Sequence, residues 1–139
     1  MNWKPRAACV VLLAAAAPLH AAQDSLSWSS PDRRISAEIA AMPEGLRLSA
    51  GIDGHTLFED CPLGIRYADG TELGPGLRLI SSDHRRIDRT DTLAWGIRST
   101  LRDHCGEYTC RFAPDDNAET ALIVRLRLYN DAVAFRYEI

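Results

Sequence analysis

The chain has 139 residues and a formal net charge of −3. This length allows one domain of ordinary size at most. The acidic balance disfavours nucleic-acid binding, which needs clustered Lys and Arg, and aspartates interrupt the two basic clusters at 33–34 and 84–86.

Residues 1–22 have the organisation of a secretory signal peptide. Lys4 and Arg6 precede an apolar run from Ala7 to Ala17, and small residues suited to cleavage follow at 21–22. The apolar run is much shorter than the ~20 residues that span a bilayer. We therefore expect a secreted protein, periplasmic or extracellular, with no membrane span. Its mature part would carry 14 basic and 19 acidic residues.

From Ser25 onward the pattern is one of short strands and turns. Apolar and polar residues alternate over 35–39 and 46–52, with a turn at Pro43-Glu44-Gly45 between them. Asp53-Gly54 is a strong hairpin signal that leads into a strand at 55–58. The remaining expected strands cover 63–67, 77 to about 87, and 122–128, with turns at 69–70 and 115–117 and a Gly/Pro loop at 73–76.

The final residues, 133–139, also alternate. Val133, Phe135, Tyr137 and Ile139 share one face, and Ala134, Arg136 and Glu138 share the other. No turn residue and no polar tail follows this strand. The pattern favours the front part of a larger protein, or a shortened gene product, whose last strand continues or pairs with later residues.

No segment after residue 22 has helical periodicity over ten or more residues, and turn signals recur about every 8–12 residues. Strands with one apolar face favour antiparallel pairing. We predict one all-β domain over residues 23–139, an antiparallel β-sandwich or barrel.

Three cysteines lie outside the predicted signal peptide. In an oxidising compartment Cys105 and Cys110 could bridge across a tight turn and leave Cys61 free. The alternative is that all three are small buried apolar residues, and spacing alone does not decide between them. No CxxC occurs and the histidines are scattered, so we expect no metal site.

The segment 95–108 concentrates side chains suited to ligand contact. An array of Trp, Arg, Asp and His can hydrogen-bond to polyhydroxylated or anionic ligands, whereas the plainer alternative is surface ion pairs beside a core Trp. The candidate contact residues are Trp95, Arg98, Arg102, Asp103, His104 and Glu107.

Catalytic motifs are missing from the sequence. Glycoside hydrolysis requires two positioned carboxyl groups, and no acidic residue here stands in a matching motif. No Gly-x-Ser-x-Gly elbow occurs either. We expect no catalytic residue and no activity from this chain alone.

An ordered set of motifs resembles the N-terminal domain of glycoside hydrolase family 97, whose members are secreted bacterial α-glucosidases and α-galactosidases. The set covers nearly all of the predicted mature chain. In chain order it comprises Trp28-Ser-Ser-Pro-Asp32, Pro62-Leu-Gly-Ile65, Trp95-Gly-x-Arg-Ser99, Arg102-Asp-His104 with Glu107, and Asp131-Ala-Val-Ala-Phe-Arg-Tyr137.

The resemblance implies a galactose-mutarotase-like super-sandwich, incomplete at its C-terminus, that packs against a catalytic (β/α)₈ barrel absent from this chain. In the family the catalytic carboxylates and most ligands of a calcium ion lie in that barrel, so no cofactor is expected here. The N-terminal domain supports the barrel and lends residues to the rim of the active site, for which Arg102 to Glu107 are the best candidates. The family usually has an aromatic residue and an Asn where this chain has Cys105 and Gly106.

The implied function is therefore that of a carbohydrate-contacting and supporting domain, with carbohydrate and a catalytic barrel as partners. Three alternatives stay open. The chain could be a stand-alone carbohydrate-binding module, an interaction protein whose open edge accepts a strand, or a non-functional remnant.

Overall fold

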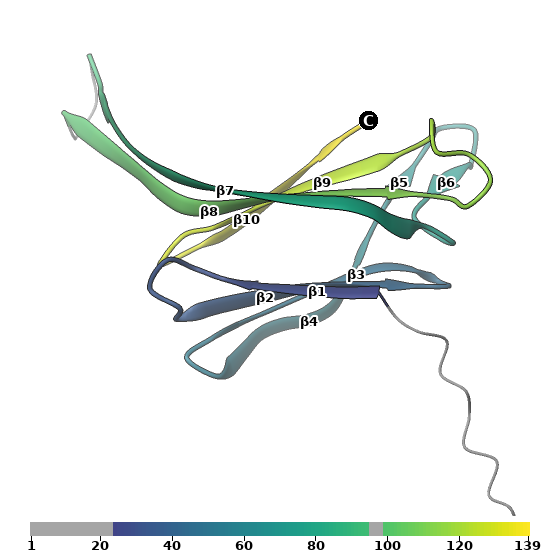
Figure 1. Ribbon diagram of the computed structural model, residues 1–139, viewed down its shortest axis with the longest axis horizontal. Helices are drawn as coiled ribbons and strands as arrows, with labels where there is room; N and C mark the ends of the chain where they lie inside the picture. The colour runs from purple at the N-terminus through teal and green to yellow at the C-terminus, as the bar shows by residue number, and fades with distance from the viewer. Residues whose placement is uncertain (1–23, 95–98) are drawn as a thin grey trace, which may run out of the picture.

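Two four-stranded antiparallel sheets face each other in the computed structural model, which describes residues 24–94 and 99–139 (Figure 1). The first sheet has the order β1-β2-β3-β4 and the second has the order β10-β9-β8-β7. The predicted all-β, antiparallel fold is thus confirmed. The predicted signal peptide lies outside the described residues.

The strands of the first sheet are β1 (Asp24–Ser29), β2 (Ile35–Met42), β3 (Gly45–Ile52) and β4 (His55–Leu63). Those of the second are β7 (Arg78–Thr92), β8 (Thr100–Ala113), β9 (Leu122–Leu128) and β10 (Val133–Glu138). Between them in sequence, β5 (Ile65–Arg66) and β6 (Glu72–Leu73) form a small separate pair.

The hairpin between β3 and β4 forms where Asp53-Gly54 predicted it. Ile52 pairs with His55, so the turn contains two residues. Asp53 and Gly54 have φ values of 50° and 80°, and two positive values are what a type I′ turn requires. Beyond this turn the β3–β4 register shifts on either side of Ala50, and Leu48 and Ala50 both lie on the buried face of β3.

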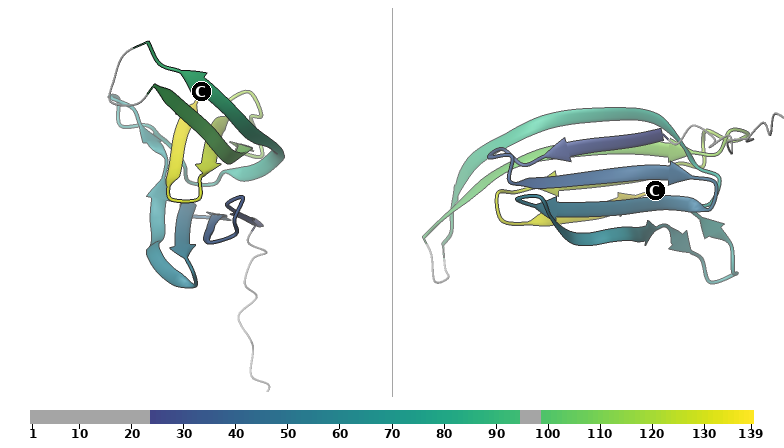
Figure 2. Two further views of the ribbon diagram at one scale, coloured as in Figure 1. Left: turned by 90° about the vertical axis from the view of Figure 1, so that its left-hand side faces the viewer. Right: turned by 90° about the horizontal axis from the view of Figure 1, so that it is seen from below.

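The two sheets lie face to face (Figure 2), and the side chains of the core come from both of them. Alternate residues of β2, β3 and β9 are almost fully buried, as the sequence pattern predicted. The principal core side chains are Ile35, Ile39, Leu46, Leu48, Phe112, Leu122, Val124, Leu126 and Leu128.

The β7–β8 pair is much longer than the sequence predicted. β8 pairs with β9 only between Gly106 and Phe112, whereas its pairing with β7 continues to Thr92 opposite Thr100. Residues 87–92 and 100–105 therefore form a two-stranded extension, here called the arm. Figures 1 and 2 show the arm running past the end of the first sheet.

Strand β10 alternates as expected and forms one edge of the second sheet. The side of that sheet facing the first sheet is called the inner face, and the opposite side the outer face. Phe135 pairs with the core residue Leu126 but remains 47% exposed. No helix among the described residues is long and apolar enough to cross a membrane.

The proposed Cys105–Cys110 disulfide is wrong. Both residues are buried free thiols within β8, and Cys61 is free and half-buried. The segment contains no tight turn. Five residues of strand span about 17 Å, far beyond the Cα separation of a disulfide, and an odd spacing puts the two side chains on opposite faces.

Candidate functional site

The alternation of β8 divides the predicted contact residues between the two faces of the second sheet. Tyr108 belongs to the core, so the even-numbered residues Arg102 and His104 lie on the inner face. Asp103 and Glu107 lie on the outer face. Trp95 and Arg98 lie outside the described residues.

One exposed ion pair and one exposed arginine–histidine contact lie on the inner face at the arm. Arg102 binds both carboxylate oxygens of Asp88, at 2.8 and 2.9 Å. The hydrogen bond from Arg102 lowers the pKa of Asp88. Nη2 of Arg86 lies 3.3 Å from Nε2 of His104. The side chain of Arg102 is 63% exposed, so this pair contributes little to the stability of the domain.

Glu107 is the centre of a buried ionic cluster on the outer face. Its carboxylate accepts hydrogen bonds from Arg85 of β7 at 2.6 Å and from Arg127 of β9 at 2.7 Å. Arg125 donates a third bond at 3.1 Å. Glu107 is only 1% exposed, so the guanidinium groups have replaced water around its charge.

The pKa of Glu107 reflects this environment. Burial alone raises it, but the hydrogen bonds and charges of Arg85 and Arg127 outweigh burial and hold the pKa at about 2. The carboxylate therefore stays ionised at any physiological pH. It cannot act as a general acid near neutrality, and its role is that of a fixed structural anion.

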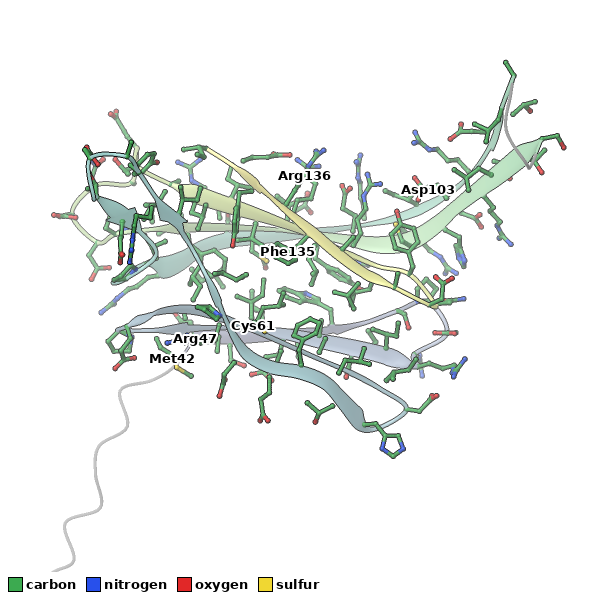
Figure 3. All side chains as sticks on the ribbon, turned by 180° about the vertical axis from the view of Figure 1, so that it is seen from behind. Met42, Arg47, Cys61, Asp103, Phe135 and Arg136 are labelled. Carbon is green, nitrogen blue, oxygen red and sulfur yellow. The ribbon has the colours of Figure 1, made fainter. Side chains whose placement is uncertain are left out.

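Asp103 connects this cluster to the arm. It accepts a hydrogen bond from the hydroxyl of Tyr129 at 3.1 Å and forms ion pairs with Arg89 at 3.4 Å and Arg127 at 3.6 Å. Figure 3 shows Asp103 and Arg136 on the outer side of the second sheet, with Phe135 toward the first sheet. Arg127 thus contacts both acidic residues of β8, Asp103 and Glu107.

Tyr108 fills the space that the small Gly106 leaves. A Cβ atom on Gly106 would lie 2.8 Å from the Tyr108 hydroxyl oxygen. The tyrosine ring stacks on His84 at 4.7 Å and on Trp28 at 5.1 Å, and its hydroxyl donates to the Ser29 carbonyl at 3.0 Å. At Gly106, where this chain departs from the family pattern, an aromatic stack therefore fills the space beside the glycine.

The sequence analysis missed the arginines that surround Glu107. Arg85, Arg125 and Arg127 lie 18 to 22 positions from it, and only the strand register brings them together. The one available signal was the alternation of Arg125 and Arg127 with core leucines, which marks them as neighbours on one outer face.

Within residues 24–94 and 99–139, no group of three or more His, Cys, Asp or Glu side chains could hold a metal. Calcium needs six to eight oxygen ligands, whereas the buried carboxylate of Glu107 is already committed to arginines.

Comparison with known proteins identifies similar sequences. Residues 28–139 match the family model described as "Glycosyl-hydrolase 97 N-terminal". The chain is also 32% identical, over 125 residues, to a protein of Streptomyces bingchenggensis (strain BCW-1) named probable retaining alpha-galactosidase. That alignment covers 87% of this chain and 19% of the relative.

Solved structures share the fold. A glycoside hydrolase family 97 enzyme from Pseudoalteromonas sp. strain K8, solved in complex with panose, superposes with a TM-score of 0.76 and 22% identity. The match covers 82% of this chain and 17% of that one. A β-arabinopyranosidase matches with a TM-score of 0.71 and 23% identity, over 81% and 18% of the two chains. The present chain thus spans less than a fifth of these proteins.

Proposed function

The chain belongs to glycoside hydrolase family 97 as its N-terminal domain, and on that premise we propose that it serves a secreted enzyme acting on α-glucosides or α-galactosides. In this role the domain supports a catalytic domain and contributes contact residues to the rim of the active site. Carbohydrate and the catalytic domain are its partners, and the catalytic carboxylates belong to the partner domain.

The arm is the observation that supports this role most directly. An isolated two-stranded hairpin is marginally stable in water, and within the part of the chain that the structure describes no third strand pairs with residues 87–92 or 100–105. A hairpin that extends past the sandwich is suited to pack against a neighbouring domain.

The polar groups of the arm suit a rim position. Arg102 is held by its ion pair with Asp88, and His104 by a hydrogen bond with Arg86; both contacts lie on the surface rather than in the core. Surface polar contacts of this kind can exchange their partners for sugar hydroxyls or for groups of another domain. We therefore assign Arg102 and His104, together with the neighbouring Trp95 and Arg98, to the proposed rim.

Export is part of the proposal. The basic and apolar segments of residues 1–22 support secretion to the periplasm or beyond. Calcium, where the complete enzyme uses it, is assigned to the catalytic domain, because the described residues of this chain do not fit the ion.

The test is the mass and activity of the native product. An antibody against residues 24–139 would be used to identify and purify the exported protein, which is then assayed on nitrophenyl α-glucoside and α-galactoside. We expect a product several times heavier than this chain that hydrolyses one of the two substrates. An exported product of the chain's own mass, inactive on both, would contradict the proposal.

A further inference from the structure

Strand β10 is the end strand that is least protected against pairing with another chain. Within residues 24–94 and 99–139, the end strands of the two main sheets are β1, β4, β7 and β10. Seven of the fifteen residues of β7 are Arg or Asp, and β4 contains Pro62 and the register shifts beside Ala50. Such features discourage edge-to-edge pairing. β10 has neither proline nor bulge, and its register with β9 is unbroken over six pairs.

The free edge of β10 also carries exposed apolar side chains, whereas β1 exposes no large hydrophobic residue. Phe135 is 47% exposed on the inner face, and Ile139 is 78% exposed directly after the strand. The Phe135 ring packs edge-on against Tyr137 at 5.8 Å, and the hydroxyl of Tyr137 accepts a hydrogen bond from the backbone N–H of Gly64 at 3.2 Å. A strand added beside β10 would therefore cover apolar surface that is already held in place.

The sequence of β10 is complementary to itself in one antiparallel register. A two-fold axis through Tyr137 places Arg136 opposite Glu138 of the second copy, and Phe135 opposite Ile139, on both sides of the axis. An axis through Arg136 would instead place two guanidinium groups opposite each other, and an axis through Phe135 would pair neither charge with its opposite. Charge complementarity therefore selects the register centred on Tyr137.

The contacts of these charges within one chain are compatible with this register. Arg136 binds Glu138 at 2.7 Å, and Glu138 also accepts a hydrogen bond from Arg125 at 2.9 Å. Directly opposed residues of antiparallel strands have Cβ atoms about 5 Å apart, whereas residues two positions along one strand are about 7 Å apart. Glu138 can therefore keep Arg125 and exchange its own Arg136 for that of the second copy. Such an exchange adds specificity rather than affinity.

We propose that two copies of this chain pair through β10, with Tyr137 opposite Tyr137, and join their second sheets into one continuous sheet. Backbone hydrogen bonds and the burial of Phe135 stabilise the pair, and the contacts of Arg136 with Glu138 select its register. The proposal rests on the edge of β10 and not on the proposed function. A monomeric chain would therefore overturn the dimer and leave the proposed function untouched.

The molar mass of the chain purified after export, measured by light scattering over a range of concentrations, tests the dimer. We expect a reversible rise to twice the mass of the monomer. A constant monomer mass up to millimolar concentration would overturn the proposal. Growth beyond two copies would also overturn it, because a two-fold pair leaves no second β10 edge free.

Two charge-reversed variants test the register. Arg136→Glu and Glu138→Arg each bring like charges together across the axis, so each variant alone should associate about tenfold more weakly than the parent or worse. An equimolar mixture of the two restores both opposite-charge pairs and should recover the affinity of the parent. Dimerisation of the single variants at the parent's affinity, or a mixture that stays monomeric, would refute the register.

Arg66→Glu is the matched control. Arg66 and Arg136 are 76% and 64% exposed, and each forms an ion pair with one glutamate of its own chain, Glu72 or Glu138. We expect Arg66→Glu to dimerise as the parent does, with a thermal midpoint close to that of Arg136→Glu. Equal affinities of these two variants would overturn the proposal, and this comparison decides the matter even where Glu138→Arg, which faces Arg125, fails to fold.

Discussion

Removing the charge of Glu107 should destabilise the domain substantially, because its carboxylate is buried and bound by three arginines. In Glu107→Gln the side chain keeps its shape, but its amide NH₂ would meet guanidinium donors, and Arg85, Arg125 and Arg127 lose their shared anion. The variant therefore keeps three positive guanidinium groups around a neutral buried side chain. In the parent protein the buried carboxylate compensates their charge.

The magnitude follows from the pKa of the carboxyl group. A fall from 4.5 to about 2 corresponds to about 3 kcal/mol of preferential stabilisation of the charged form in the folded state. Breaking a fully buried ion pair costs roughly 3–5 kcal/mol. The three arginine side chains are 23–62% exposed and can regain water. We therefore expect the free energy of unfolding to fall by about 2–3 kcal/mol, less than for a fully buried pair.

The pH dependence has a definite sign. Because the folded-state pKa is lowered, the contribution of Glu107 is complete above about pH 5 and is lost as the pH falls toward 2. Urea unfolding of parent and Glu107→Gln should therefore differ most at pH 7, by about 2–3 kcal/mol, and the two curves should converge in acid. The control Glu72→Gln, an exposed partner of Arg66, should stay within about 0.5 kcal/mol of the parent. A Glu107→Gln variant as stable as this control at pH 7 would refute the reasoning.

Three further predictions concern β8. Gly106→Ala should lower stability by roughly 1–3 kcal/mol, because its Cβ would collide with Tyr108, and an unchanged unfolding midpoint would show that the stack moves freely. Cys105 and Cys110 should both react with a thiol reagent in the unfolded, unreduced chain, whereas protection of the pair would reveal a bridge. Arg102→Ala should weaken sugar binding or hydrolysis in the complete enzyme at an unchanged melting temperature. Binding and activity equal to those of Arg66→Ala would remove Arg102 from the rim.

Local sequence signals were sufficient for most of the fold. The strands around Asp53-Gly54 and the alternating strand 122–128 could be predicted because turn chemistry and period-2 burial agree there. The long strand β8 could not. Gly106, Glu107 and Tyr108 are buried in succession, so its burial does not alternate with polarity and the segment looked irregular.

The sequence named candidate contact residues, but it did not predict how they are arranged. Alternation along 102–107 already implies that Arg102 and Asp103 face opposite ways, and applying it would have separated the rim candidates from Glu107. The partners of Glu107 required the register of three strands, which depends on long-range packing. Burial of a charged residue is likewise a property of its neighbours rather than of its own position in the sequence.

The position of the Glu107 cluster links the stability of the sandwich to the proposed role of the arm. Pairing between β8 and β9 ends at Gly106 on the side of the arm. The arm begins at the adjacent β7–β8 pair, Ile87 opposite Cys105. Glu107 lies at this boundary and bonds to both flanking strands, β7 through Arg85 and β9 through Arg127. Because Asp103 extends the same contacts one step into the arm, the ionic network limits how far the arm can pivot at its base. Arg102, as a proposed rim residue, can then be held at a fixed place even though no third strand among the described residues pairs with the strands that carry it.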